Sequence, residues 1–263
     1  MILKNLIDFH CHLDLYPEFE SIIKECEQTG VYTLAVTTTP RAWPRNRDLT
    51  LKTKYVRAAL GFHPQLIDKD YHKDLSLWEK YLPEACYIGE VGIDASARFS
   101  HTIREQTQAF EHILQCCSKA GGKILSVHCV RSASIILDVI EKNVSANRVG
   151  IVLHWFTGSI VEAKRAVAIG CYFSINPKML KTKKCHDLLE VIPRERILTE
   201  TDGPFTELHN KPAKPKDAAN TVSLLAGIYN ADIDIMARCI YSNLKILLKK
   251  YSSKNLTQPK AGE

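Results

Sequence analysis

The feature that most constrains the fold of this chain is a regular alternation of short β-rich segments with helix-forming segments. Most stretches between the β-rich segments repeat their apolar residues with a helical period. Strand, helix and strand in repeated succession indicate right-handed parallel crossovers. The predicted strands are residues 6–12, 32–39, 55–62, 86–91, 123–129, 149–155, 171–175 and 196–202.

Eight such units close into an α/β fold, the (β/α)8 TIM barrel, for which a chain of 263 residues is long enough. The competing fold is a doubly wound open sheet, which normally carries a glycine-rich phosphate loop after its first strand. Here the first predicted strand ends in His10-Cys11-His12 without such a loop. We therefore predict a single barrel over residues 1–251, with its last helix at 234–251, and a flexible C-terminal tail over residues 252–263.

Composition narrows the class of protein. Apolar residues make up 45% of the chain and charged residues 24%, which excludes a disordered or fibrous protein. The net charge of +6 permits a polyanionic partner without requiring one. No apolar run reaches the roughly 18 residues of a membrane-spanning helix, and the N-terminus does not resemble a signal peptide. The nine cysteines include no CxxC pair, so we expect reduced thiols, a cytoplasmic protein and no membrane partner.

Residue types that bind metals interrupt the predicted strands near their carboxyl ends, where a barrel of this type carries its active site. Side-chain alternation places His10 and His12 on one face of their strand, and Glu200 and Asp202 on one face of theirs. A single buried histidine is more simply a core residue. A set of four imidazoles and two carboxylates without a cation, however, would leave several polar groups unpaired. The predicted metal ligands are His10, His12, Glu90, His128, His154 and Asp202.

Six ligand-type side chains exceed the needs of one catalytic zinc ion, which takes about three protein ligands and a water. They suit two divalent ions, and Glu90 is the predicted bridge because it comes from the middle of the strand order. Nitrogen-rich ligation favours zinc, manganese and other transition metals over magnesium, although the sequence does not choose among Zn, Mn and Mg. Such a pair lowers the pKa of a bound water and holds a phosphoryl or carbonyl group in line.

Three carboxylates receive further roles. Asp202 is the candidate for binding one metal and orienting the attacking water. Glu200 and Asp8 are candidates for holding a ligand imidazole in its tautomer, as carboxylates beside metal-binding histidines do. For Asp8 the alternative is a cap on a helix or loop.

The motifs, taken together and in order, resemble the TatD family of metal-dependent deoxyribonucleases, which are barrels of the amidohydrolase superfamily. The matching segments are the H-x-H at 10–12, GEVGID at 89–94, the histidine at 128, HWFTG at 154–158, YFSINPKM at 172–179 and ILTETDGP at 197–204. The resemblance implies one metal held by His10, His12, Glu90 and Asp202. It implies a second metal held by Glu90, His128 and His154.

The same resemblance implies that His63, in the segment GFHP, lies near the scissile phosphate rather than on a metal. The alternative for His63 is an N-terminal cap before Pro64. The family usually has an arginine two residues after the histidine of the fifth strand. Here Arg131 comes one residue later and is a candidate substrate contact.

Three details are closer still to the TatD-like nucleases of the Qat bacterial antiphage system. They are TTTP at 37–40, ALGFHPQL at 59–66 and HWFTGS at 154–159. This resemblance implies a role in antiphage defence, with other Qat system proteins as partners.

Basic residues gather in the segments that follow three predicted strands, and we expect them to form a phosphate-binding rim around the mouth of the barrel. Trp43, which lies among arginines, is the candidate for stacking on a base of single-stranded DNA. The alternative is a set of solvated surface charges. The predicted substrate contacts of this rim are Arg41, Trp43, Arg45, Arg47, Lys178 and Lys183, and further lysines follow at 181, 184, 211, 214 and 216.

The sequence therefore predicts a two-metal phosphodiesterase that acts on DNA, as an exonuclease on single-stranded or frayed ends. One alternative is a dinuclear amidohydrolase with a nucleotide or aminoacyl substrate. The other is a binding subunit of a defence complex, in which the metals are structural.

Overall fold

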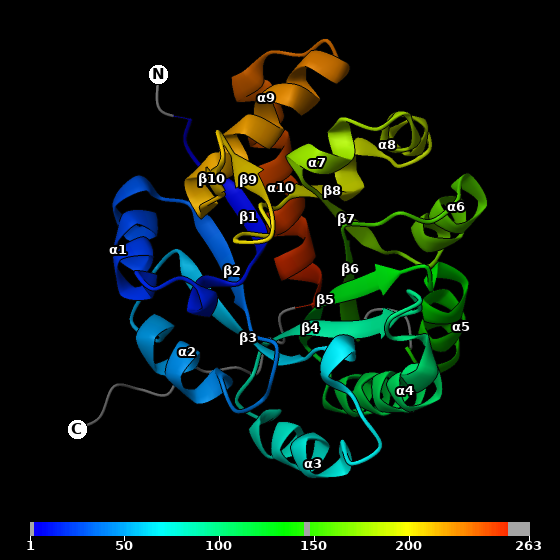
Figure 1. Ribbon diagram of the computed structural model, residues 1–263. Helices are drawn as coiled ribbons and strands as arrows, with labels where there is room; N and C mark the ends of the chain where they lie inside the picture. The colour runs from blue at the N-terminus through cyan, green and yellow to red at the C-terminus, as the bar shows by residue number, and fades with distance from the viewer. Residues whose placement is uncertain (1–2, 145–147, 252–263) are drawn as a thin grey trace.

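The computed structural model describes residues 3–144 and 148–251. Eight parallel strands follow one another in chain order, each hydrogen-bonded to the next, and helices surround them (Figure 1). The strands are β1 (Ile7–Cys11), β2 (Tyr32–Val36), β3 (Val56–Phe62), β4 (Tyr87–Asp94), β5 (Lys123–Val130), β6 (Val149–His154), β7 (Tyr172–Ile175) and β8 (Ile197–Thr199). The predicted TIM barrel is confirmed.

The helices fill the connections between strands, as the helical periods predict. They are α1 (Phe19–Thr29), α2 (Trp43–Thr50), α3 (His72–Tyr81), α4 (Ile103–Ala120), α5 (Ala133–Asn143), α6 (Ile160–Ala168), α7 (Pro177–Leu180), α8 (Lys183–Leu189), α9 (Ala218–Ile228) and α10 (Ile233–Tyr251). None of these helices is both long enough and apolar enough to cross a membrane. The predicted tail at 252–263 lies outside the described residues.

The sequence sets where individual helices begin and end. Helix α1 buries Phe19, Ile22, Ile23 and Cys26, which are spaced to share one face, and it ends at Gly30. Gly30 has a φ of 73°, in the left-handed region that glycine adopts without strain. Helix α6 begins with a capping box, in which Ser159 and Glu162 satisfy each other's backbone amides.

The first and last strands join through hydrogen bonds that involve the end of β8 and the segment that continues it. The Thr199 hydroxyl donates to the Ile7 carbonyl at 2.5 Å, the Asp202 amide to the His10 carbonyl at 2.8 Å, and the His12 amide to the Gly203 carbonyl at 2.8 Å. A short antiparallel pair, β9 (Glu207–Leu208) and β10 (Lys211–Pro212), follows this junction. The barrel therefore closes at the place where His10, His12 and Asp202 lie.

Candidate metal centre

The six predicted metal ligands come from strands spread around the barrel, and all six point into its interior. His10 belongs to β1, His12 follows β1 directly, Glu90 belongs to β4 and His128 to β5. His154 ends β6, and Asp202 lies three residues beyond β8. None of the six is more than 7% exposed. The fold thus brings together residues from both ends of the chain at the carboxyl ends of the strands.

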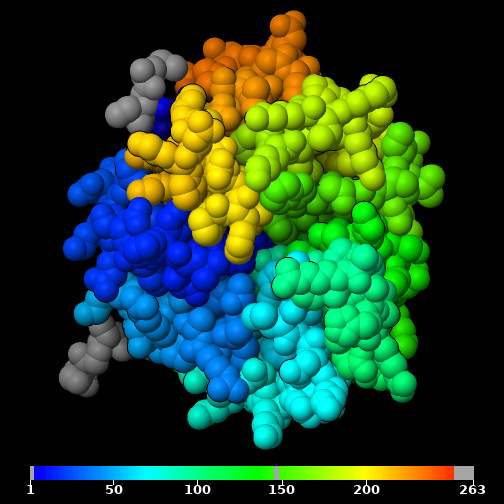
Figure 2. All heavy atoms as spheres, viewed as in Figure 1, coloured from blue at the N-terminus to red at the C-terminus, as the bar shows by residue number. Residues whose placement is uncertain are grey.

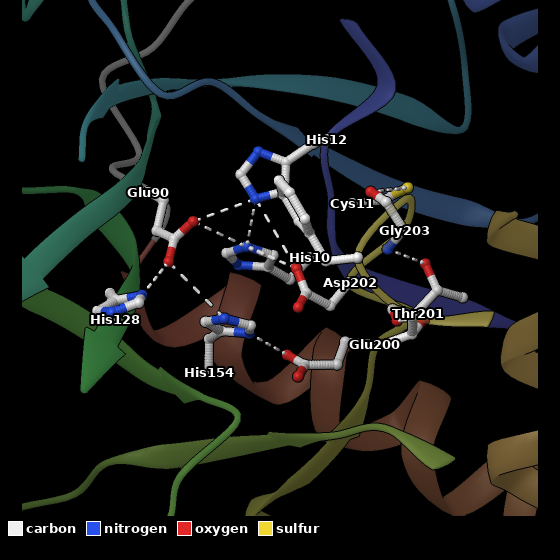
Figure 3. Close-up of polar contacts among 12 residues, drawn as sticks. His10, Cys11, His12, Glu90, His128, His154, Glu200, Thr201, Asp202 and Gly203 are labelled. Carbon is white, nitrogen blue, oxygen red and sulfur yellow. Dashed lines mark hydrogen bonds and ion pairs between the residues drawn. The ribbon is translucent and has the colours of Figure 1, made fainter. Parts of the chain in front are cut away.

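Glu90 lies between two sets of nitrogen atoms (Figure 3). Its Oε2 is 3.1 Å from His12 Nε2 and 3.4 Å from His10 Nε2. Its Oε1 is 2.5 Å from His128 Nδ1 and 3.7 Å from His154 Nε2. Asp202 Oδ1 is 3.7 Å from His10 Nε2 and 3.8 Å from His12 Nε2, on the side of the first set. One carboxylate therefore separates two groups of potential metal ligands.

The chemistry of these donors fits divalent metal ions. The Nε2 atoms of His10 and His12 are 3.3 Å apart. Two nitrogens bound to one tetrahedral ion at about 2.1 Å lie about 3.4 Å from each other. Burial lowers the pKa of His10 well below its usual value, which keeps a neutral imidazole with a free lone pair. Burial opposes ionisation of Glu90, but His63, His10 and His128 outweigh it and hold its pKa well below the usual value, so the carboxylate is anionic.

Three of the four ligand imidazoles, those of His10, His128 and His154, have a partner on the other ring nitrogen, as is usual for metal ligands. His154 Nδ1 is 2.9 Å from Glu200 Oε2, and Asn176 Nδ2 donates to Glu200 Oε1 at 2.9 Å. The Ser174 hydroxyl also donates to Glu200. Asn176 caps α7 through its side-chain oxygen, which accepts from the Met179 amide at 3.0 Å. Asn176 therefore both caps α7 and, through Glu200, holds the ligand His154 in place.

Two further residues that hold ligand imidazoles in place were not among the predicted site residues. Asp94 Oδ2 lies 3.1 Å from His128 Nε2 and accepts from Gln65 Nε2 at 2.7 Å. The Ser126 hydroxyl lies 2.7 Å from His10 Nδ1. The alternation of side chains along a strand could have identified both residues. Ser126 lies two residues before His128, and Asp94 lies four residues after Glu90, so each shares a face with a predicted ligand.

Asp8 does not orient an imidazole, so that expectation is wrong. Its Oδ1 accepts from the Thr201 amide at 2.7 Å, and its Oδ2 accepts from the Thr201 hydroxyl at 2.5 Å. A third, longer hydrogen bond of 3.4 Å comes from the His10 amide. Burial raises the pKa of Asp8 to about 8. Its place is in the junction between β1 and the continuation of β8.

His63 forms the predicted N-terminal cap, and its ring also lies beside the candidate metal centre. Its Nδ1 accepts from the Gln65 amide at 3.1 Å and caps the short 3-10 turn Pro64–Leu66. Its Nε2 is 3.2 Å from Glu90 Oε2, and its side chain is 11% exposed. The cap therefore fixes the ring at the edge of the metal centre.

Five of the six predicted ligands line an open cavity of about 370 Å³, whose wall includes Gln65, Trp155, Thr157 and Phe205, and the sixth, His10, is fully buried beside them. A second cavity of about 250 Å³ adjoins it, because His63 lines both. Figure 2 shows the face of the molecule hollowed between the yellow segment around β9 and β10 and the cyan segment after β3.

The structure contradicts the prediction that Trp43 stacks on a base. Trp43 is 3% exposed, and its ring packs 5.3 Å from that of Tyr81. Arg47 lies over the same indole and forms a 2.6 Å ion pair with Glu84. Glu84 stands between α3 and β4, at the amino ends of the strands, so Arg47 is directed away from the mouth.

The other predicted substrate contacts differ in how close they lie to the two cavities. Arg41 lines the second cavity and pairs with Asp74 at 2.7 Å. Arg45 lies over the ring of Phe19, and Lys183 pairs with Asp187 along α8 at 2.7 Å. Neither of these two lines either cavity.

Two more of these contacts lie close to the first cavity. Arg131 is exposed and follows Val130, a residue of the cavity wall. Lys178 Nζ donates to the Phe205 carbonyl at 2.8 Å. Of the predicted substrate contacts, Arg41, Arg131 and Lys178 therefore lie at or beside the two cavities. Among the further lysines, Lys184 is also close, because its Nζ donates to the carbonyl of Thr157 in the wall of the first cavity.

Comparison with known proteins agrees with this geometry. A family model described as "TatD related DNase" matches residues 7–249. Human deoxyribonuclease TATDN3 is 25% identical over 246 residues, which cover 85% of this chain and 88% of the relative. The metal-dependent hydrolase YjjV of Escherichia coli strain K12 is 27% identical over 253 residues, which cover 90% of this chain and 95% of the relative.

The crystal structure of YjjV aligns with this structure at a TM-score of 0.81 and 23% sequence identity, covering 94% of this chain and 98% of that chain. The likeness shows the same barrel. The family predicted from the motifs is confirmed by the family model. This chain is a metal-dependent hydrolase that belongs to the family of TatD-related DNases.

Proposed function

We propose that this hydrolase cleaves phosphodiester bonds in DNA with the help of two divalent metal ions. The observation that carries the proposal is the position of Glu90, whose two oxygens face separate sets of imidazole nitrogens. A shared carboxylate between two donor sets is typical of dinuclear centres that act on phosphate esters.

The ligands divide between the two ions in the proposed centre. His10, His12 and Asp202 would hold one ion together with Glu90, and His128 and His154 would hold the other with the same carboxylate. Nitrogen-rich sets of this kind favour zinc, manganese or a similar transition metal over magnesium. When bound, two such ions make a water more acidic and neutralise charge on the phosphate.

The protein's own side chains position the reactants. Asp202 lines the cavity and lies beside the first donor set, where its carboxylate accepts a hydrogen bond from the attacking water. His63 stands at the edge of both cavities, where its ring faces the phosphate of a bound strand. Glu200 keeps His154 in place, since its charge is held by hydrogen bonds from Ser174 and Asn176.

Three features favour a DNA substrate with a free or frayed end. The family and the human relative are both described as deoxyribonucleases. The chain carries a net charge of +6, which attracts a polyanion. The reactive groups lie at the base of a cavity, which a single strand enters more readily than a stacked duplex does.

The test is hydrolysis of labelled single-stranded, frayed and blunt oligonucleotides, in parallel with a panel of amides and esters, with added manganese. We expect cleavage of the oligonucleotides, fastest for single strands, and a loss of about 100- to 1,000-fold for Glu90→Gln and Asp202→Asn. Glu20→Gln, at an exposed position on α1, is the matched control. Hydrolysis of the amides alone would establish the amidohydrolase alternative instead.

We also propose a role in bacterial antiphage defence, supported by the segments at 37–40, 59–66 and 154–159 that resemble nucleases of the Qat system. Other proteins of that system are then the proposed partners. Phage protection in cells that carry the complete system should be lost on Asp202→Asn, with the protein level unchanged. Protection that survives this substitution would point to a binding subunit rather than an enzyme.

A further inference from the structure

Two aromatic side chains at the mouth of the barrel have no part in the metal centre. Trp155 directly follows the ligand His154, and Phe205 lies three residues after the ligand Asp202. Both line the first cavity. Phe205 is 56% exposed, which leaves a large apolar surface in contact with water.

Each ring is fixed against a different donor set. The Phe205 ring stands edge-on to His12, with the ring centroids 5.1 Å apart, and the Phe205 amide donates to the Asp202 carbonyl at 2.9 Å. The Trp155 ring stands edge-on to His154, at 6.3 Å. The two aromatic rings therefore flank the place where a phosphate would lie.

The backbone at Trp155 is held in an uncommon conformation. Its φ is 42°, in the left-handed region that a bulky side chain rarely adopts. Strain of this kind persists only where the surrounding structure over-determines it, and it gathers at ligand sites. The conformation turns the chain directly after β6, and the indole lies in the wall of the cavity.

Lys178 links the two aromatic residues. Its Nζ donates to the Phe205 carbonyl at 2.8 Å and lies 5.8 Å from the centroid of the Trp155 ring. Two aromatic rings in the cavity wall thus have one positive charge beside them. Sequence-tolerant sites for single-stranded nucleic acid have this composition, since every base has a face that stacks and every nucleotide has a phosphate.

We propose that Trp155 and Phe205 form a base-binding subsite, with Lys178 beside it for the phosphate of the same nucleotide. The inference rests on the proposed function and makes it more specific. A base that stacks here has left its partner strand, so the subsite selects nucleotides at single-stranded or frayed ends. Trp155 and Phe205 would then stack on a base in place of Trp43, which is buried.

The test uses single-stranded oligonucleotides in which one end nucleotide, at the 3′ end or at the 5′ end, is replaced by an abasic residue. The sugar, the phosphate and the scissile bond are then unchanged, and only the base is missing. We expect the wild-type enzyme to show a kcat/KM about 5- to 150-fold higher for the intact end than for the abasic end, at the end where cleavage begins.

Phe205→Ala should reduce this ratio towards one, mainly through a higher KM for the intact end, and Phe205→Tyr should retain it. Trp155→Phe tests the second ring without removing it and should keep part of the ratio. Leu51→Ala, which shortens a side chain that is 60% exposed on the far end of α2, is the control for loss of surface apolar area.

The outcomes separate the two proposals. If the wild-type enzyme cleaves intact and abasic ends equally well, or if Phe205→Ala leaves the ratio unchanged, the base-binding subsite is wrong while the nuclease function stands. If the wild-type enzyme cleaves no oligonucleotide, the proposed function is wrong and the subsite falls with it.

Discussion

At the scale of single residues, the metal centre depends on groups that never reach the substrate. Glu200 is 0% exposed and accepts hydrogen bonds from Ser174, Asn176 and the His154 ring. A carboxylate in this place fixes the tautomer of the imidazole and makes its other nitrogen a better ligand. Asp94 has the same relation to His128. The two imidazoles that face Glu90 Oε1 therefore each have their own carboxylate.

This arrangement predicts the effect of Glu200→Gln. The amide keeps the shape of the side chain but removes the charge that stabilises His154, so the affinity for the metal should fall by about 10- to 100-fold. Metal content after dialysis and calorimetric titration with zinc or manganese measure the change. Glu190→Gln, at an exposed position, should leave both unchanged. An unaltered affinity in Glu200→Gln would mean that His154 does not bind metal.

At the scale of elements, the eight strands could be predicted from the sequence because each is a short β-rich apolar run, and five of them end in polar residues of the kinds that bind metals. The predicted strand at 55–62 and the helix at 234–251 agree with β3 and α10 to within one residue. The strand predicted at 196–202 is shorter in the structure, because β8 ends at Thr199. The segment beyond it bonds to β1 through irregular hydrogen bonds instead.

The predicted ligands of the candidate site follow from the same regularity, since barrel topology brings strand ends together whatever lies between them. The predicted basic rim did not follow from this regularity, because not every residue of a segment after a strand lies at the mouth of the barrel. Helix α2 starts near the carboxyl ends, but its first residue, Trp43, turns into the core, and Arg47 reaches the opposite end of the barrel at Glu84. These directions depend on packing between helices, which a single sequence does not encode locally.

The close approach of β4 to β5 predicts that substitution of Gly92 in β4 is far more destabilising than substitution of a glycine in open space. Gly92 has a φ of 141°, and a Cβ there would lie 2.1 Å from the carbonyl oxygen of His128 in the neighbouring strand. Gly92→Ala should therefore lower the free energy of unfolding by more than about 3 kcal/mol and displace His128. Chemical denaturation and metal content measure both effects.

Gly227, near the end of α9, is the matched control. A Cβ there meets no atom within 4 Å, and its φ lies outside the left-handed region. Gly227→Ala should raise the free energy of unfolding by about 0.4–1 kcal/mol, because alanine loses less backbone entropy in a helix. Equal stability of the two variants would contradict the close approach of β4 and β5.

At the scale of the whole molecule, the centre links metal binding to folding. Glu90 and Asp202 come from opposite sides of the barrel, so the proposed pair of metal sites forms only when the barrel is closed. Protein stripped with a chelator should melt about 5–10 °C below protein with metal at about 100 times its dissociation constant. Differential scanning calorimetry measures the shift, and Glu90→Gln should show less of it. Identical melting with and without metal would contradict the proposed centre.

The junction of β1 with the continuation of β8 has a consequence for protein synthesis. Asp202, whose amide bonds to the His10 carbonyl, is synthesised 192 residues after His10. Any unfinished polypeptide that stops short of this point lacks both the closing strand and an acidic ligand. A nascent chain that already carries His10 therefore stays without hydrolytic activity until the ribosome has added Asp202 and the barrel can close.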